Sequence, residues 1–323
     1  MADRRRCSMI ALDQELDRYL AVRRGLGFEL RTDERILRRF IEYAERVGAE
    51  YVSAEIFIGW RETFGGASQH TWSRRLGMVR FFAQWLHGID PQHQVPSRDL
   101  IPSRQRRSRP YIYTPDEIRA IVEAAAGLPS TNGIRSLTYP VLFGLIAVTG
   151  LRISEAISLD SGDVDLETGV LTLRKGKLGK ARLIPVSRCT TLQLAAYAKE
   201  RDRLLERSSQ PFFVADHGER VADCSARYNF ATVCQTIGLR ERQRFNKHGR
   251  GPRIHDLRHT FAVRTMLNWY RSGMDPAREM IKLTTYLGHA SPEHTYWYIE
   301  AVPELLALAS ARAEHSMTSE GSL

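Results

Sequence analysis

The stretch HDLRHT at residues 255–260 decides how this chain is interpreted, and LGH at 287–289 and TYWY at 295–298 complete it. Apolar residues at helical spacing predict a helix that starts near His255. His255 and Arg258 are three residues apart, so both side chains project on one side of the first turn. Free amide N–H groups and the helix dipole already favour an anion at that end. The pattern indicates an anion site, suited to a phosphodiester and needing no metal.

The aromatic segment that follows is predicted to begin a new helix. Gly288 ends the preceding helical segment, and Ser291 with Pro292 supplies a start signal for the next one. On that helix Tyr296 and Tyr298 point roughly 200° apart. One of them can therefore pack in the core, which is the usual place for a cluster of aromatics, while the other faces the anion site.

A zinc-binding helix is the competing interpretation of the two histidines. His255 and His259 are four residues apart, as in helices of the H-E-x-x-H type. Here Asp256 replaces the glutamate, the cation Arg258 would lie between the ligands, and no third ligand follows at metal spacing. We therefore expect no metal and no cofactor, and we expect His259 to be a structural histidine.

A second pair of charged residues lies upstream, in a helical segment predicted from Leu151 to Leu159. Arg152 and Glu155 are one turn apart, so the carboxylate can hold the guanidinium. Such a pair is common on solvated helix surfaces. Without further context the sequence favours a surface ion pair.

A glycine-containing hairpin follows, with strands predicted over 164–173 and 181–186. Its tip, residues 174–180, carries three of the six lysines, in a chain with 41 arginines. Arginine cannot release a proton near neutral pH, whereas lysine can. The tip is therefore a place where an ammonium group itself is useful, and the candidates are Lys175, Lys177 and Lys180.

The first hundred residues are predicted to form a bundle of about four helices. Apolar residues at helical spacing mark them, over roughly 12–25, 32–48, 54–63 and 68–86. The composition then changes to a Pro-, Ser- and Arg-rich stretch without a hydrophobic period, which indicates a linker. The predicted division is a helical domain at residues 1–100, a basic linker at 101–113, a second domain at 114–316 and a disordered tail at 317–323.

The chain's length and charge indicate a two-domain protein that binds a polyanion. Its 323 residues contain 43% hydrophobic and 26% charged residues, which is typical of globular proteins. The formal charge is +10, and a basic surface binds polyanions by releasing their counterions. Nucleic acid is the leading partner, although charge runs are also typical of solvated helix faces. The candidate contacts are Arg74, Arg75 and Arg80 in the bundle, Arg106 and Arg107 in the linker, and Arg244 in a basic loop predicted over 240–253.

Cysteine usage and hydropathy indicate a reducing, intracellular setting. The four cysteines include no C-x-x-C pair, and acidic residues follow the basic N-terminus too soon for a secretory leader. No run approaches the ~20 apolar residues that cross a bilayer. We expect a cytoplasmic protein without membrane contact.

Five motifs, taken in order, resemble the tyrosine recombinase family, the phage-integrase type of site-specific recombinase. They are Thr149-Gly-Leu-Arg-Ile-Ser-Glu155, the lysine hairpin, His255-x-x-Arg258-His259, Leu287-Gly-His289, and Tyr298 nine residues later. The resemblance covers residues 114–301, and the N-terminal bundle resembles the family's core-binding domain more loosely. It implies a mainly α, two-domain fold: a helical, SAM-like core-binding domain and an α+β catalytic domain with a small antiparallel sheet.

The resemblance carries catalytic roles onto matching positions. Arg152 and Arg258 match the two arginines that clamp the phosphate, and Tyr298 matches the nucleophile. His255 and His289 match the two site histidines, with His255 as the expected acceptor of the tyrosine proton.

Two further matches complete the implied site. Glu155 matches an acidic position behind the arginines, and Lys177 matches the general-acid lysine. The hairpin is one residue longer than in the family, so Lys175 and Lys180 stay open as alternatives. The implied reaction joins Tyr298 to a 3′ phosphate and frees a 5′-hydroxyl, without metal or ATP.

The resemblance also implies partners. They are double-stranded DNA at a specific site and a homotetramer assembled on DNA, in which the C-terminal segment docks on a neighbouring subunit. An accessory recombinase or a DNA-bending protein is a further candidate. Two other functions stay open: a type IB topoisomerase, which reseals the same strand, and a DNA-binding regulator on an inactive scaffold. Integration, transposition and dimer resolution are not distinguished by the sequence.

Overall fold

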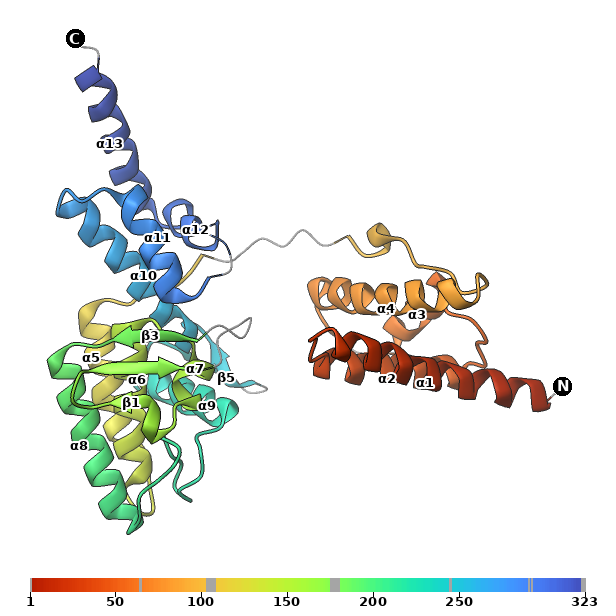
Figure 1. Ribbon diagram of the computed structural model, residues 1–323, viewed down its shortest axis with the longest axis horizontal. Helices are drawn as coiled ribbons and strands as arrows, with labels where there is room; N and C mark the ends of the chain where they lie inside the picture. The colour runs from red at the N-terminus through yellow and green to blue at the C-terminus, as the bar shows by residue number, and fades with distance from the viewer. Residues whose placement is uncertain are drawn as a thin grey trace. The chain divides into compact units, whose positions relative to one another are not determined.

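The computed structural model describes residues 2–63, 66–102, 109–174, 181–243, 246–289, 291 and 293–320, without the side chains at 2–11, 243, 246–250, 294, 300–301 and 313–320. The chain divides into two compact units, Met1–Arg107 and Ser108–Leu323 (Figure 1). Each unit has its own hydrophobic core. In the described part of the chain, no helix is long and apolar enough to span a membrane.

The first unit is the predicted helical bundle. Serine caps start two of its helices: the hydroxyl of Ser53 accepts the N–H of Ile56 at 3.4 Å, and the hydroxyl of Ser68 accepts the N–H of Thr71 at 3.3 Å. Its core is rich in buried aromatic rings such as Phe40 and Trp60. The elements are α1 (Ala2–Gly25), α2 (Arg31–Arg46), α3 (Ala54–Glu62), α4 (Gln69–Ile89) and the short 3-10 turn η1 (Arg98–Leu100).

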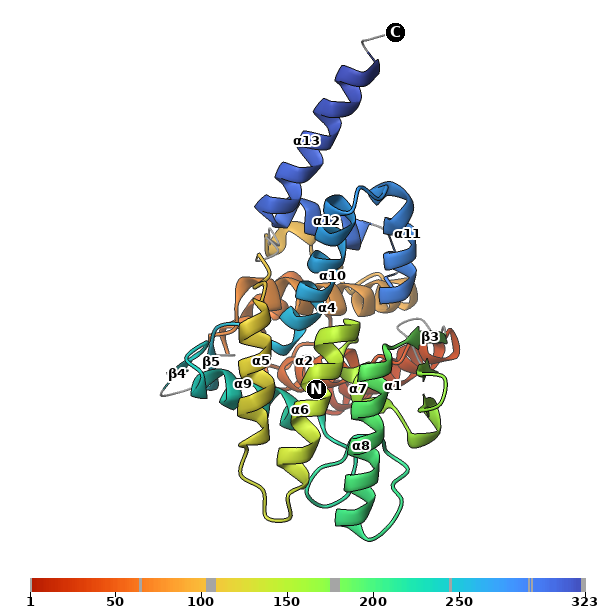
Figure 2. The ribbon, with the colours of Figure 1, turned by 90° about the vertical axis from the view of Figure 1, so that its left-hand side faces the viewer.

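Long helices form the larger core of the second unit. Helix α6 lies between α5 and α8 (Figure 2). Thr114 and Glu117 cap α5 reciprocally, and this capping box fixes where the helix starts. One of the helices, α9, has no counterpart among the predicted elements. The bounds are α5 (Pro115–Ala126), α6 (Ile134–Thr149), α8 (Arg188–Leu205) and α9 (Asp223–Thr236).

A small antiparallel sheet packs on this core, in the strand order β1-β2-β3. The strand predicted over 164–173 is in fact two strands, because Asp165 turns the chain: its Oδ1 accepts the N–H groups of Glu167 at 2.9 Å and Thr168 at 3.0 Å. The lysine tip, residues 175–180, lies outside the described residues. The bounds are η2 (Ser161–Asp163), β1 (Val164–Asp165), β2 (Val170–Leu173) and β3 (Arg182–Pro185).

A second hairpin replaces the basic loop predicted over 240–253. Strands β4 (Glu241–Gln243) and β5 (Asn246–Arg250) pair antiparallel with a bulge. The prediction was wrong because this pairing uses backbone groups, while its arginine-rich sequence lacks the apolar alternation by which a strand is recognised. Arg244, which follows β4 in the sequence, is outside the described residues.

Helix α10 connects the larger core to a smaller one. Ile254 and Leu257, near its start, belong to the first core, and Val263 and Met266 belong to the second. Helices α11 to α13 complete the second core, and α13 includes residues 317–320, which were expected in a disordered tail. The bounds are α7 (Ile153–Ser158), α10 (Ile254–Arg271), α11 (Pro276–Leu287), α12 (Glu293–Ala301) and α13 (Pro303–Glu320).

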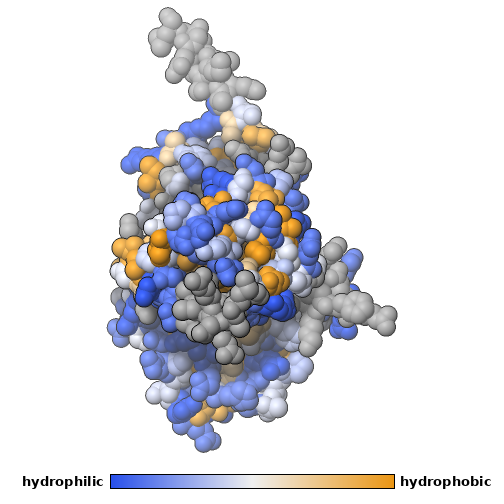
Figure 3. Space-filling model, turned by 90° about the vertical axis from the view of Figure 1, so that its right-hand side faces the viewer, coloured by the Kyte–Doolittle hydropathy of each residue, from blue (hydrophilic) through white to orange (hydrophobic). Residues whose placement is uncertain are grey.

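The face drawn in Figure 3 is mixed rather than apolar. On the face drawn in Figure 3, hydrophilic residues predominate and hydrophobic residues lie between them in small groups. Scattered apolar residues of this kind are normal on a globular protein.

The predicted mainly α fold with a small antiparallel sheet is confirmed.

Candidate active site

Arg258 lies where α10 passes from one core to the other, and it is 1% exposed. Its Nη1 donates to the carbonyl of Gly150 and its Nη2 to the carbonyl of Leu287, both at 2.7 Å. These carbonyls lie at the C-terminal ends of α6 and α11, where the helix dipole is negative. Burial, followed by the neighbouring Arg152, lowers the pKa of Arg258 to about 10. The guanidinium therefore stays charged at neutral pH.

Glu155, in the first turn of α7, is the carboxylate that three cations share. Its Oε1 accepts from Nη1 of Arg152 at 2.7 Å, and its Oε2 accepts from Nη2 of Arg182 at 2.9 Å. Nη1 of Arg258 lies 4.0 Å from Oε2. Burial alone would raise the pKa of this carboxyl, but hydrogen bonds from Arg182 and Arg152 hold it below its usual value. Three guanidiniums against one carboxylate leave a net positive site, which favours a further anion.

The surface ion pair favoured for Arg152 and Glu155 is therefore wrong. Glu155 is only 5% exposed, because β3 and α11 close over α7. Arg152 also donates from Nη2 to the carbonyl of Gly288 at 3.0 Å. A pair three residues apart in sequence cannot reveal that distant segments enclose it.

Arg182, the first residue of β3, is a site residue that the sequence did not reveal. Besides Glu155, it binds the carbonyl of Tyr286 through Nε at 3.0 Å. Strand alternation was the available signal, because Arg182 shares a face with the fully buried Ile184 while Leu183 is 65% exposed. An arginine on the inward face of a strand needs a buried counter-charge, and here that charge is Glu155.

Two glycines let the backbone approach these arginines. Gly150 and Gly288 end α6 and α11 with φ values of 64°. A Cβ on Gly288 would lie 2.6 Å from Nη1 of Arg182, and one on Gly150 would lie 2.5 Å from Cδ1 of Phe261. Glycine is therefore required at both positions for two reasons: the backbone is left-handed, and a side chain would collide with Phe261 at Gly150 and with Arg182 at Gly288.

His255 and His259 lie one turn apart on α10, with their rings edge to face and their centroids 4.7 Å apart. Desolvation by the surrounding protein, followed by Arg258, lowers the pKa of His255 to about 4, although the residue retains an exposed surface. Burial, followed by His255 and Arg258, lowers the pKa of His259 to about 3. Both imidazoles are neutral at pH 7. Within the described ranges, no group of three His, Cys, Asp or Glu residues is placed to hold a metal.

Tyr298 lies on α12 and is 2% exposed, while Tyr296 is 45% exposed, so the two tyrosines point apart as predicted. The Tyr298 hydroxyl lies 2.8 Å from Nδ1 of His259. We expected His255 to meet this hydroxyl and His259 to be structural, but the structure places His259 against it. Tyr298 is also near enough to Arg258 to raise the pKa of that guanidinium.

A threonine pair holds His289 and was not revealed by the sequence. Nδ1 of His289 lies 2.8 Å from Oγ1 of Thr295, which lies 3.0 Å from Oγ1 of Thr284. Both threonines are buried. Because Thr295 precedes Tyr298 by one turn of α12, this network connects His289 to the helix that carries the tyrosine.

The candidate nucleic-acid contacts are only partly described. Lys175, Lys177, Lys180, Arg106, Arg107 and Arg244 all fall outside the described residues. In the first unit, Arg74 is exposed, Arg75 stacks on Trp72 with its guanidinium carbon 4.5 Å from the ring centroid, and Arg80 donates to the carbonyl of Pro96. Among these three arginines, Arg74 is the most open to solvent.

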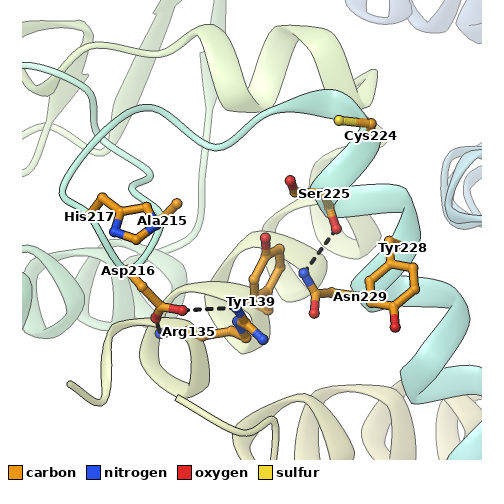
Figure 4. A pocket seen from close by; sticks show the side chains of 9 residues that line it. All are labelled: Arg135, Tyr139, Ala215, Asp216, His217, Cys224, Ser225, Tyr228 and Asn229. Carbon is orange, nitrogen blue, oxygen red and sulfur yellow. Dashed lines mark hydrogen bonds and ion pairs between the residues drawn. The ribbon is translucent and has the colours of Figure 1, made fainter. Parts of the chain in front are cut away.

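A separate pocket of about 460 Å³ opens beside the start of α6 and along α9 (Figure 4). Its polar groups pair with one another: Nη2 of Arg135 lies 2.9 Å from Oδ2 of Asp216, and Nδ2 of Asn229 donates to the carbonyl of Ser225 at 2.9 Å. The pocket is lined by residues other than those of the arginine cluster. It is a less suitable site for chemistry than the surroundings of Tyr298.

Comparison with known proteins matches residues 112–304 to the phage integrase family. A protein of Sinorhizobium fredii (strain NBRC 101917 / NGR234), named as an integrase/recombinase, is 37% identical over 311 residues, which is 95% of this chain and 98% of the relative. The tyrosine recombinase XerD of Mycobacterium tuberculosis is 32% identical over 91% of this chain and 96% of its own length.

Among solved structures, the Tn1549 transposon integrase in complex with transposon right end DNA superposes with a TM-score of 0.64 at 16% identity. The match covers 95% of this chain and 99% of that one. At this identity the likeness supports the fold alone.

Proposed function

Since the chain belongs to the phage integrase family and is a tyrosine-type site-specific recombinase, we propose that Tyr298 cleaves double-stranded DNA and forms a 3′-phosphotyrosyl intermediate. The observation that carries this proposal is the cluster of three guanidiniums around Glu155, with the Tyr298 hydroxyl 2.8 Å from His259, the residue that follows Arg258 on α10. A net positive pocket next to a buried phenol is what attack on a phosphodiester requires.

The arginines have the role of holding the scissile phosphate. Arg152 and Arg258 bind its non-bridging oxygens and stabilise the charge that gathers in the transition state. Arg182 and Glu155 keep the two guanidiniums aligned before DNA arrives, so little reorganisation is needed at the reaction step. His289, fixed by Thr295, is a further donor to the phosphate.

The bond changes balance without an external cofactor. The Tyr298 oxygen bonds to phosphorus as the bond from phosphorus to the 5′ oxygen breaks, and a histidine takes the phenolic proton. The leaving 5′ oxygen takes a proton from the hairpin lysine, for which Lys177 is the first candidate and Lys175 and Lys180 are the others. The bond energy is kept in the phosphotyrosine, so a 5′-hydroxyl of a partner strand can reverse the step.

The two units divide the work in this proposal. The helical bundle, residues 1–100, and the basic linker, 101–113, bind the duplex, with Arg74, Arg75, Arg80, Arg106 and Arg107 as candidate phosphate contacts, and Arg244 of the catalytic domain is a further candidate. The catalytic domain, 114–316, carries the chemistry. Four copies assemble on DNA in the cytoplasm, with an accessory recombinase or DNA-bending protein as a further candidate partner. Integration, transposition or resolution of a mobile element is the biological role.

Plasmid recombination tests this function. A supercoiled plasmid carrying two copies of the DNA that flanks the coding sequence is incubated with the wild type, Tyr298→Phe and Tyr296→Phe. We expect recombinant circles from the wild type and from Tyr296→Phe, and none from Tyr298→Phe. Relaxed plasmid without recombinants would instead support a type IB topoisomerase, and equal products from Tyr298→Phe would exclude it as the nucleophile.

A further inference from the structure

His289 is held by its backbone and by its ring, and both attachments lead to Thr284. Its backbone N–H donates to the Thr284 carbonyl at 3.0 Å, just after the left-handed turn at Gly288. Nδ1 of its ring lies 2.8 Å from Oγ1 of Thr295, which lies 3.0 Å from Oγ1 of Thr284. These contacts distinguish the two ring nitrogens, because Nδ1 is the one that meets the threonine pair.

The direction of these hydrogen bonds decides which nitrogen carries the proton. The Thr284 hydroxyl donates to Oγ1 of Thr295, and it also lies 2.8 Å from the carbonyl of Met280, one turn back in α11. Thr295 is the third residue of α12, so it lacks the preceding helical turn that Thr284 has. Because a hydroxyl has one proton, Thr295 accepts from Thr284 and donates to Nδ1 of His289. An accepting nitrogen carries no proton, so the neutral ring has its proton on Nε2.

A neutral imidazole with its proton on Nε2 suits this site better than an imidazolium. The carbonyl of Leu287 accepts from Arg258 at 2.7 Å. The carbonyl of Gly288, the residue before His289, accepts from Arg152 at 3.0 Å. A further positive charge beside these guanidiniums is unfavourable. A neutral Nε2–H group adds a donor for the phosphate without adding a charge.

We propose that Thr295 is a positioning residue for DNA cleavage, which fixes His289 as the tautomer that donates from Nε2 to the scissile phosphate. This assignment rests on the proposed function, in which His289 is a phosphate donor. Thr284 supports Thr295 by supplying the hydrogen bond that turns its hydroxyl toward Nδ1. Since Thr295 precedes Tyr298 by one turn of α12, the same contact ties the phosphate donor to the helix of the nucleophile.

The test compares Thr295→Val, which keeps the shape of the side chain without its hydroxyl, with Thr295→Ser, which keeps the hydroxyl. Thr285→Val is the matched control, because the exposed Thr285 lies next to Thr284 and donates within its own helix, to the carbonyl of Ile281 at 3.0 Å. The rate of covalent complex formation is measured in single turnover on a nicked duplex that the wild type cleaves, together with DNA affinity and melting temperature.

We expect Thr295→Val to bind DNA with unchanged affinity and to cleave about 10- to 100-fold more slowly, because the phosphate donor is no longer held in place. Thr295→Ser and Thr285→Val should cleave close to the wild-type rate. In a His289→Ala background, Thr295→Val should cost less than about twofold, because Thr295 acts through the imidazole. If Thr295→Val cleaves at the wild-type rate, or costs as much without the imidazole as with it, the proposal is wrong.

A measurement without DNA separates this proposal from the proposed function. The ¹⁵N signals of the His289 ring, assigned with His289→Ala, show at pH 8 which nitrogen carries the proton. We expect the proton on Nε2 in the wild type and in Thr295→Ser. In Thr284→Val it should move in part to Nδ1, because Thr295 can then accept from the ring. If the wild type carries the proton on Nδ1, or if Thr284→Val leaves the signals unchanged, the proposal fails, whether or not the wild type cleaves DNA.

Discussion

Glu155 is the residue on which the arginine cluster depends. It is 5% exposed and separates three guanidiniums that would otherwise repel one another. Removing one partner of a buried ion pair is costly, because the remaining charges stay buried without compensation. The cluster of three guanidiniums and one carboxylate therefore keeps a net positive charge, which favours binding of an anion.

Glu155→Gln should lower the free energy of unfolding by about 3 kcal/mol, because the amide keeps the shape but not the charge. Urea unfolding measures this loss. The control is Glu200→Gln, which removes an exposed pair with Arg203 on α8 and should leave stability unchanged. Equal stability of the two variants would mean that the arginines near Glu155 are not paired as described.

The pKa of His259 predicts a dependence of stability on pH. Its pKa in the folded chain is about 3, below the usual 6.5. Between pH 3 and pH 6.5 His259 is therefore protonated in the unfolded chain but not in the folded chain. Stability should therefore fall as pH drops below 6.5, with His259 contributing at most about 1.4 kcal/mol per pH unit. Urea unfolding at pH 7, 6 and 5 should show a steeper loss for the wild type than for His259→Asn. Parallel losses would contradict the lowered pKa.

At the scale of residues, the sequence predicts some of the site but not its partners. Arg152, Glu155 and Arg258 are recognisable because each lies in a short motif with a fixed spacing. Arg182 is not, because its contact with Glu155 depends on how β3 packs beside α7. The sequence also could not show which imidazole contacts Tyr298, since His255 and His259 share one helix face and only the position of α12 brings His259 to the hydroxyl.

At the scale of elements, the ends of α6 and α11 deliver backbone carbonyls to the arginines. Gly288→Ala tests this arrangement. It should destabilise the protein by more than the ~1–2 kcal/mol that a left-handed alanine costs, because its Cβ would also displace Arg182. It should also slow DNA cleavage, because the Gly288 carbonyl binds Arg152.

Gly273→Ala is the matched control for this substitution. Gly273 has φ of 68°, close to that of Gly288, but no atom lies within 4 Å of its would-be Cβ. It should show the backbone cost alone and normal cleavage. If Gly288→Ala and Gly273→Ala have the same free energy of unfolding and the same rate of DNA cleavage, the close approach of Gly288 to Arg182 does not contribute to stability or activity.

The elements that were predicted have strong local signals, and those that were not lack them. Helices α3 and α4 follow Ser53 and Ser68, whose side chains cap them. The pair β4 and β5 was not predicted, because its pairing is made by backbone groups and its arginine-rich sequence has no alternation of apolar and polar residues. The buried residues of α9 recur at helical spacing, but Asn229 is polar and Ala226 and Ala231 are small, so the apolar signal of this helix is weak.

At the scale of the whole molecule, the chain combines two units with separate cores and a formal charge of +10. The family match covers residues 112–304, and so lies within the second unit, where the arginine cluster and Tyr298 are found. The first unit adds a basic helical bundle to this core. Such a combination suits a protein that binds a long polyanion and reacts with it at one point.

Whether Tyr298 is the nucleophile is tested directly by trapping on a nicked suicide duplex in EDTA, with the wild type, Tyr298→Phe and Tyr296→Phe. We expect a covalent complex from the wild type and Tyr296→Phe, none from Tyr298→Phe, and a nucleotide adduct on the peptide that carries Tyr298. A covalent complex that survives in Tyr298→Phe, or an adduct mapped to another residue, would contradict it.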